Sequence, residues 1–141
     1  MTGKTFELNI FGYWRDKNII CLPKLPGVYF VYEASYNRDT DALSFIRLIY
    51  IGEADNVNER ILKHEKYSDW LKYIGYGSEL CYSMVQVENA YRERIEAAYI
   101  YEHKPPANEK HIDKFPFNKT RIKSTSDTEL LNKDFTIDKT N

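Results

Sequence analysis

The sequence has few cysteines, no long apolar run and almost no net charge, and each shortage excludes a class of protein. Its two cysteines, Cys21 and Cys81, lie far apart with no CxxC partner, so the ligand spacing of a structural zinc site is missing. No apolar stretch approaches the ~20 residues that a membrane-spanning helix needs. The first nine residues lack the basic and then apolar layout of a signal peptide. We therefore expect a cytoplasmic protein with reduced thiols and no membrane partner.

The charge balance gives no sign of nucleic-acid binding. The chain has 20 basic and 21 acidic residues, a net charge of -1, whereas many dedicated DNA-binding proteins are visibly basic. Tyrosine is by contrast abundant, with 12 residues among 141. Because a tyrosine ring packs like a hydrophobic side chain and keeps a polar tip, this excess suits half-buried sheets and surfaces that meet bases or sugars.

Three segments have the composition of β-strands. Residues 28–33 and 45–51 are rich in β-forming side chains, and the polar, turn-rich stretch between them indicates an antiparallel hairpin with a long tip. Residues 80–87 alternate between two sets of side chains and predict a third strand.

Helical periodicity begins near Asn56, and a side-chain oxygen of Asp55 or Asn56 can cap the first turn. A second, short helix is expected within residues 68–77. A longer helix is predicted from Asn89, as its cap, to about His103. Two consecutive prolines, beginning at Pro105, end it because neither can donate the next hydrogen bond.

Some side chains between these elements could cut a phosphodiester. That reaction needs a base for the attacking water, stabilisation of a negative transition state and neutralisation of the leaving oxygen. Arg60 is a candidate phosphate clamp, because its guanidinium stays charged and matches phosphate oxygens. His64 lies one helical turn further on and can face the same groove. The ordinary alternative is a surface arginine and histidine with no chemical role.

Glu96 is the candidate ligand for a catalytic metal. Mg²⁺ prefers oxygen ligands and often takes only one or two from the protein, so one carboxylate is enough. Glu93, one turn earlier, is a rival, and Glu88 and Glu102 are weaker ones. A helical glutamate is commonly a solvated surface charge, and the Pro105-Pro106-Ala107-Asn108 run downstream is what favours Glu96.

Two tyrosines each lie two residues from a glycine at one end of a strand-like run, in Gly27-Val28-Tyr29 and in Tyr50-Ile51-Gly52. Core or hairpin packing would explain either tyrosine alone. Their order and spacing, taken with four further positions, resemble the GIY-YIG nuclease family. The four positions are Arg60, His64, Glu96 and Asn108.

The resemblance implies an α+β fold with a small three-stranded antiparallel central sheet flanked by helices. It covers residues 27–108, which would form the catalytic domain. Residues 1–26 would be an N-terminal extension that packs on this core. Residues 109–141 are polar and of mixed charge, and we expect a C-terminal extension that packs in part and frays toward its end.

The resemblance also implies a role for each matching residue. Tyr29 would be the base or would position the attacking water, and Tyr50 would line the site and help to hold water or phosphate. Arg60 would stabilise the scissile phosphate. His64 would assist proton transfer from Tyr29 or orient that tyrosine.

Glu96 would hold one Mg²⁺ or Mn²⁺ ion per active site, and Asn108 would tie the final loop to the site. We therefore predict a metal-dependent endonuclease, a hydrolase that cuts DNA in one step. With one site per chain, cutting both strands needs a transient homodimer or two sequential nicks. No zinc finger, helix-turn-helix or basic arm follows residue 108. Site selection would then come from the hairpin tip, either extension or a partner.

Two alternatives stay open. The near-neutral charge and the missing targeting domain also fit a catalytically silent module that binds nucleic acid or protein and keeps the fold. The same residues also fit a metal-dependent nuclease that acts on branched or damaged DNA, or on RNA.

Overall fold

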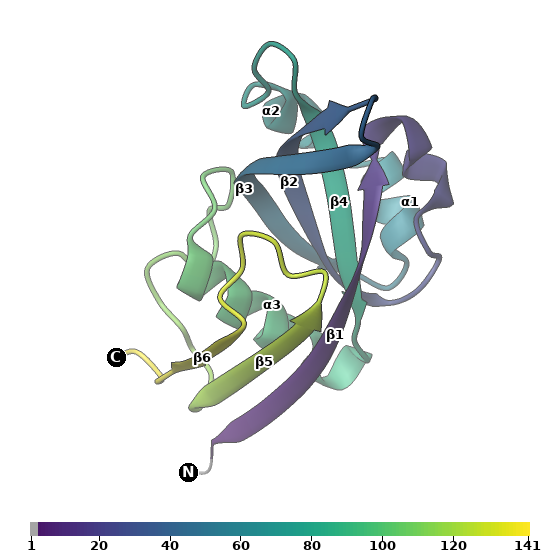
Figure 1. The fold of residues 1–141 in the computed structure, drawn as a ribbon. Helices are drawn as coiled ribbons and strands as arrows, with labels where there is room; N and C mark the ends of the chain where they lie inside the picture. Colours follow the sequence, from purple (N-terminus) through teal and green to yellow (C-terminus); the bar gives the residue numbers. More distant parts are fainter. Residues whose placement is uncertain (1–2) are drawn as a thin grey trace.

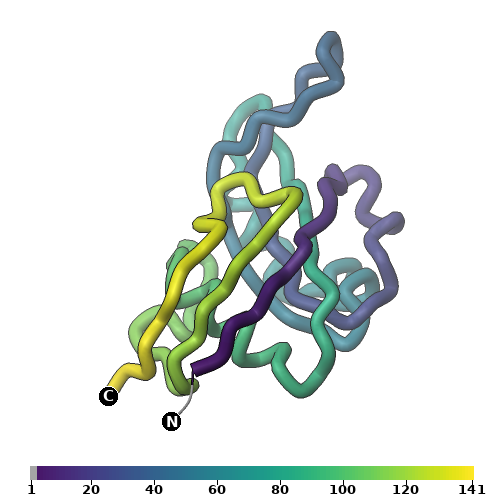
Figure 2. Tube along the Cα trace, turned by 60° about the horizontal axis from the view of Figure 1, so that its bottom comes forward, coloured from purple at the N-terminus to yellow at the C-terminus, as the bar shows by residue number. Residues whose placement is uncertain are grey.

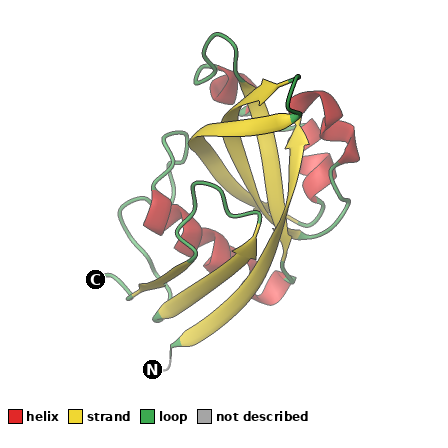
Figure 3. Ribbon diagram, in the orientation of Figure 1, coloured by secondary structure: helices red, strands yellow, loops and turns green. Residues whose placement is uncertain are grey.

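A curled, six-stranded sheet with helices on both faces forms the framework of the protein (Figure 1, Figure 3). The computed structural model describes residues 3–141. The strands are β1 (Lys4–Arg15), β2 (Gly27–Asn37), β3 (Ala42–Ala54), β4 (Glu79–Gln86), β5 (Thr120–Ser126) and β6 (Asp134–Ile137). The helices are the 3₁₀-helix η1 (Asp16–Cys21), α1 (Val57–Leu62), α2 (Tyr67–Leu71) and α3 (Asn89–His103).

The prediction of a small three-stranded antiparallel sheet was wrong, because six strands pair in the order β3-β2-β4-β1-β5-β6. The three expected strands are β2, β3 and β4, and their pairings are antiparallel. The sheet continues through β1, which is antiparallel to β4 and parallel to β5, so it is mixed. Figure 2 shows β1 running between these two neighbours, with the β2–β3 hairpin projecting at one end. The segments expected to be extensions thus supply three of the six strands.

Strand β2 divides the interior into two cores because its side chains alternate between the faces of the sheet. Val28 and Phe30 point into a core that α3 covers. Tyr29 and Val31 point into a second core, which also contains Trp70 and the buried face of α1. A strand covered on both faces has a nearly continuous apolar sequence, and this explains residues 28–32.

Helix α1 begins where the sequence predicts. The Asn56 Oδ1 atom accepts a hydrogen bond from the Glu59 backbone N–H at 3.0 Å, so of the two candidate caps, Asp55 and Asn56, the helix uses Asn56. The backbone N–H of Val57 donates to the Leu25 carbonyl at 2.9 Å. This contact fixes the start of α1, and hence Arg60 on its last turn, against the N-terminal segment.

Helix α3 lies along the opposite face and carries Glu96. The residue at its N-cap is Glu88, which makes no side-chain capping hydrogen bond. The cap therefore lies one residue before Asn89, the position that the sequence predicted. The helix ends at His103, and the residue at its C-cap, Lys104, has a left-handed φ of 46°. The proline pair then leads the chain back toward β3.

The described part of the chain contains no disulfide: Cys21 is an exposed thiol and Cys81 a buried one. Within residues 3–141, every helix is too short or too polar to cross a membrane.

Candidate functional site

The two motif tyrosines and His64 lie in contact with one another. Tyr29 and Tyr50 are on neighbouring strands, and their ring centroids are 6.3 Å apart. The His64 ring meets both tyrosine rings nearly at right angles, with centroid distances of 6.2 Å to Tyr29 and 5.4 Å to Tyr50. Trp70 closes this aromatic cluster, 4.5 Å from the His64 ring. Residues from two strands and the α1–α2 segment therefore converge at one place.

The His64 ring is neutral in this cluster. Its Nδ1 atom accepts a hydrogen bond from the Lys66 backbone N–H at 3.0 Å, so in the neutral ring the proton is on Nε2. Burial, and then the nearby Arg60 charge, lower the His64 pKa to about 4. Among the described residues the buried Nε2 atom has no hydrogen-bond partner. The geometry therefore favours an orienting His64 over one that accepts a proton.

Both phenols stay protonated near neutral pH. Burial raises the pKa of Tyr29 well above its ordinary value, and that of Tyr50 to about 12. For each phenol the Arg60 charge acts to lower the pKa, and the Glu96 charge acts to raise it. A guanidinium and a carboxylate thus lie close enough to the tyrosine pair to act on it electrostatically.

Glu96 lines a cavity together with Tyr50, Asn108 and several charged side chains. Its pKa is raised to about 7, first by burial and then by the negative charge of Glu53. Lys110 acts in the opposite direction, and Glu93 adds to the increase. A bound cation would relieve this repulsion.

A metal at Glu96 would have few protein ligands. In the described chain no cluster of three or more histidine, cysteine, aspartate or glutamate side chains is arranged to hold a metal ion. A hard divalent cation such as Mg²⁺ keeps several water ligands and can bind through one or two carboxylates. The half-buried Glu96 carboxylate, in a cavity that Glu53, Glu93 and Glu109 also line, fits an ion of this kind.

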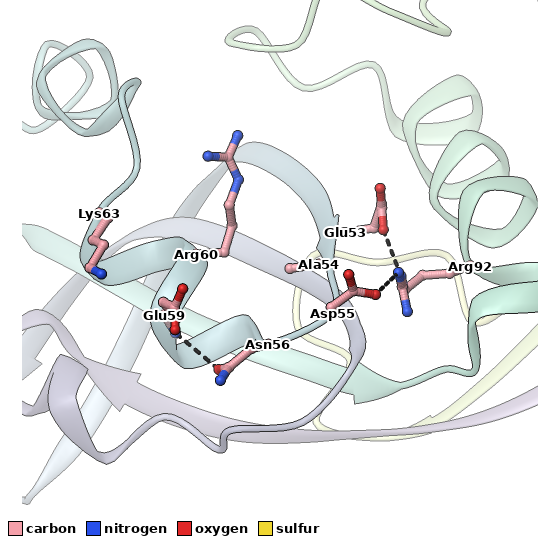
Figure 4. A pocket seen from close by; sticks show the side chains of 8 residues that line it. All are labelled: Glu53, Ala54, Asp55, Asn56, Glu59, Arg60, Lys63 and Arg92. Carbon is pink, nitrogen blue, oxygen red and sulfur yellow. Dashed lines mark hydrogen bonds and ion pairs between the residues drawn. The ribbon is translucent and has the colours of Figure 1, made fainter.

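Arg60 lies in a neighbouring cavity, shown in Figure 4, where its side chain rises from α1 opposite Glu53. Glu53 lines both cavities and therefore marks the boundary between them. The Arg60 guanidinium is paired with Glu65 through two hydrogen bonds. This pair raises the pKa of Arg60 and lowers that of Glu65 to about 2.

An ion-pair network beside Glu96 was not predicted from the sequence. The buried Arg92 side chain donates from Nε to Glu53 at 2.6 Å and from Nη2 to Asp55 at 2.5 Å (Figure 4). It thereby holds the end of β3 against α3 and keeps the Glu53 carboxylate near Glu96. Two signals in the sequence were available: Arg92 precedes Glu96 by four residues, and Glu53 directly follows Tyr50-Ile51-Gly52.

The six predicted site residues form one neighbourhood but do not share one cavity. Tyr50, Glu96 and Asn108 line the first cavity, and Arg60 lines the second. Tyr29 and His64 lie beneath the surface, 1% and 6% exposed. A phosphate in the first cavity would meet Tyr50 directly, and the buried pair would act through it.

Comparisons of the chain with protein-family models, with curated proteins and with solved structures found no match. The resemblance to GIY-YIG nucleases thus depends on the motif residues alone.

Proposed function

We propose that this protein is a metal-dependent endonuclease that hydrolyses DNA phosphodiester bonds, with a catalytic site of the GIY-YIG type. The observation that carries the proposal concerns Tyr50. This tyrosine contacts Tyr29 and His64 through its ring, and it shares a cavity with Glu96. One residue thereby connects the buried aromatic cluster to the carboxylate.

Each side chain has a role that its surroundings support. Arg60 binds two phosphate oxygens through its paired N–H groups. Tyr50 donates a hydrogen bond to water or phosphate in the cavity, because its phenol keeps its proton near pH 7. Glu96 holds the Mg²⁺ or Mn²⁺ ion, which when bound would activate water and neutralise developing charge.

Tyr29 and His64 orient other groups in the site and do not exchange protons during the reaction. The raised pKa of Tyr29 makes its phenolate scarce at neutral pH, so we favour a Tyr29 that orients water or Tyr50 over one that removes a proton. The neutral His64 ring packs against the rings of Tyr29 and Tyr50 and holds both phenols in place. In this proposal the protein works in a reducing, cytoplasmic setting. A transient homodimer or two sequential nicks would cut both strands, and the hairpin tip, either terminal segment or a partner would supply site selection.

The test is plasmid cleavage with Mg²⁺ or Mn²⁺, using the wild type, Glu96→Ala and Arg60→Ala. We expect each substitution to lower kcat/KM by roughly 100-fold or more, as when an electrostatic stabiliser of a transition state is lost. Glu88→Ala and Lys72→Ala are matched controls that each remove a like charge outside the two cavities, and we expect both variants to cleave plasmid like the wild type. Equal activity in all five proteins would mean a contaminant or a wrong site.

One observation favours a catalytically silent module as the second candidate. The Arg60 guanidinium, needed for phosphate, is already paired with Glu65. Salt-dependent DNA binding without cleavage of linear DNA, branched DNA or RNA would support this candidate. Cleavage of branched DNA or RNA alone would instead narrow the substrate of the nuclease.

A further inference from the structure

The guanidinium of Arg60 is occupied by a carboxylate of the same chain. Arg60 Nη1 donates to Glu65 Oε1 at 2.8 Å, and Nη2 donates to Glu65 Oε2 at 3.0 Å. In this bidentate geometry arginine also binds two oxygens of a phosphate. The carboxylate and a phosphodiester would use the same donors, so they cannot bind at the same time.

The pair is placed where it can open. Glu65 lies in the turn between α1 and α2, and its side chain is 63% exposed; that of Arg60 is 39% exposed. Ion pairs this exposed are weak, because water and salt compete for both partners. Among the described residues, the Glu65 side chain forms no hydrogen bond or ion pair with a residue other than Arg60. Substrate could therefore displace Glu65 without any change of fold.

A second cation near the site has the same kind of partner. Lys66 lines the Glu96 cavity, and its Nζ atom lies 3.3 Å from Glu109 Oε2. Within residues 3–141, Lys63 and Lys110, which line the two cavities, form no ion pair. The paired cations are thus matched by acidic side chains that imitate an anionic ligand.

We propose that Glu65 is a built-in competitor for the substrate phosphate: its carboxylate holds the Arg60 guanidinium until a phosphodiester displaces it. The inference rests on the proposed function, in which Arg60 clamps the scissile phosphate. A phosphodiester and a carboxylate both carry one negative charge. Replacing Glu65 with a phosphodiester beside Arg60 therefore adds little electrostatic stabilisation. An isolated phosphodiester group then competes poorly. A continuous strand is favoured, because its other contacts keep a phosphate near Arg60 at high effective concentration.

The test measures phosphate binding without any cleavage. Inorganic phosphate is titrated into the protein while NMR records the Arg60 Nε–Hε resonance, which Arg60→Gln identifies by its disappearance. The proteins are the wild type, Glu65→Gln and Glu59→Gln. Glu59 is the matched control, because it is exposed, adjacent to Arg60 and in no ion pair among the described residues. Removing its charge changes the local field without freeing the guanidinium.

We expect Glu65→Gln to bind phosphate roughly two- to fivefold more tightly, the range for an exposed ion pair, and Glu59→Gln to bind like the wild type. An equal gain in both variants would mean a general charge effect and would overturn the competitor role. Weaker binding by Glu65→Gln would mean that Glu65 holds Arg60 ready for phosphate. Either that result or an absence of phosphate binding in all three proteins would overturn the competitor role of Glu65.

The outcomes separate this inference from the proposed nuclease. If Glu65→Gln binds phosphate more tightly but neither it nor the wild type cuts plasmid, Glu65 competes at a phosphate site that is not a nuclease site. If the wild type cleaves plasmid and Arg60→Ala does not, while Glu65→Gln leaves phosphate binding unchanged, the nuclease function is supported and the competitor role of Glu65 is wrong.

Discussion

The side-chain amide of Asn108 forms two hydrogen bonds with the main chain of Ile51. Asn108 Oδ1 accepts from the Ile51 N–H at 3.0 Å, and Asn108 Nδ2 donates to the Ile51 carbonyl at 2.9 Å. Beside them, the Ala107 N–H donates to the Ile49 carbonyl at 3.0 Å. Strand β3 lies at an edge of the sheet, so one side of its backbone has no neighbouring strand. The loop after α3 forms hydrogen bonds with the peptide groups on that side. This contact fixes Tyr50 beside the Glu96 cavity.

Asn108→Ala should therefore loosen the edge of β3. Two partly buried main-chain groups of Ile51 would lose their partner, which costs about 1–3 kcal/mol of unfolding free energy. Urea unfolding measures that loss, and hydrogen exchange of the Ile51 amide locates it. Asn118→Ala is the control, because the Asn118 side chain is exposed and makes no hydrogen bond in residues 3–141. An Ile51 amide that stays fully protected would contradict the assignment.

The local elements were predictable because their signals are local. Strand β2 and strand β3 have runs of β-forming side chains, and α1 has a capping asparagine one residue before its first turn. Strands β2 and β3 are also joined directly as an antiparallel hairpin. Burial on both faces appears in the sequence as an unbroken apolar run, so β2 was recognised from composition alone.

The rest of the sheet depends on pairings that no short window contains. Strand β1 pairs with β5 in parallel, with Lys4 opposite Thr120, more than a hundred residues away. Strand β5 is mostly polar, and Ile122 is its one apolar side chain. Its alternation appears only as buried Thr120, Ile122 and Ser124, which composition does not separate from a loop. The fraying end expected there instead continues into β6, with Thr140 bonded to Phe115.

The candidate site was predictable only in part. The sequence spacing indicated Tyr29, Tyr50 and His64, which the fold brings together. The partners of the charged residues were not visible, because ion pairs such as Arg60–Glu65 depend on side-chain direction in a turn. Such pairs decide which cations are available to a phosphate.

Gly52→Ala should disrupt the aromatic cluster. A Cβ atom on Gly52 would lie 2.3 Å from the Tyr29 hydroxyl oxygen, and Tyr29 is buried and cannot move aside freely. We expect a loss of about 1–3 kcal/mol in unfolding free energy, typical of overpacking, together with a large loss of any nuclease activity. Gly75→Ala is the control, since its nearest contact would be an ordinary 3.5 Å. Equal stability of the two variants, measured by urea unfolding, would contradict the tight packing of Tyr29 on Gly52.

His64 should make the protein less stable in acid. Its pKa is about 4 in the folded chain and 6.5 without the fold, so between these values the unfolded chain binds the extra proton. The stabilisation is complete above pH 6.5 and is lost as the pH falls through 4, by at most about 3 kcal/mol. His103 and His111 also have lowered pKa values, so the measurement is the difference between wild type and His64→Asn. Parallel stability curves from pH 7.5 to 3.5 would rule out this role for His64.

Glu96 should couple Mn²⁺ binding to a proton. Its pKa of about 7 lies above the ordinary 4.5, so in the metal-free protein its contribution to stability is present below pH 4.5 and is lost as the pH rises through 7. A cation needs the charged carboxylate, so Mn²⁺ affinity should rise up to tenfold per unit toward pH 7 and level off above it. Thermal unfolding with and without Mn²⁺ at pH 5.5, 6.5, 7.5 and 8.5 measures this. Glu96→Gln should abolish the Mn²⁺ stabilisation at every pH.

Glu93→Gln distinguishes the predicted ligand from its rival on the same helix. Glu93 lies one turn from Glu96, lines the same cavity and helps to raise the Glu96 pKa. Removing its charge should lower that pKa, so the Mn²⁺ stabilisation should persist and reach its plateau at a lower pH. The opposite pattern, in which Glu93→Gln abolishes the response and Glu96→Gln keeps it, would transfer the ligand role to Glu93. Above pH 7 both variants remove one negative charge from the same cavity, so a difference between them in that range indicates direct ligation.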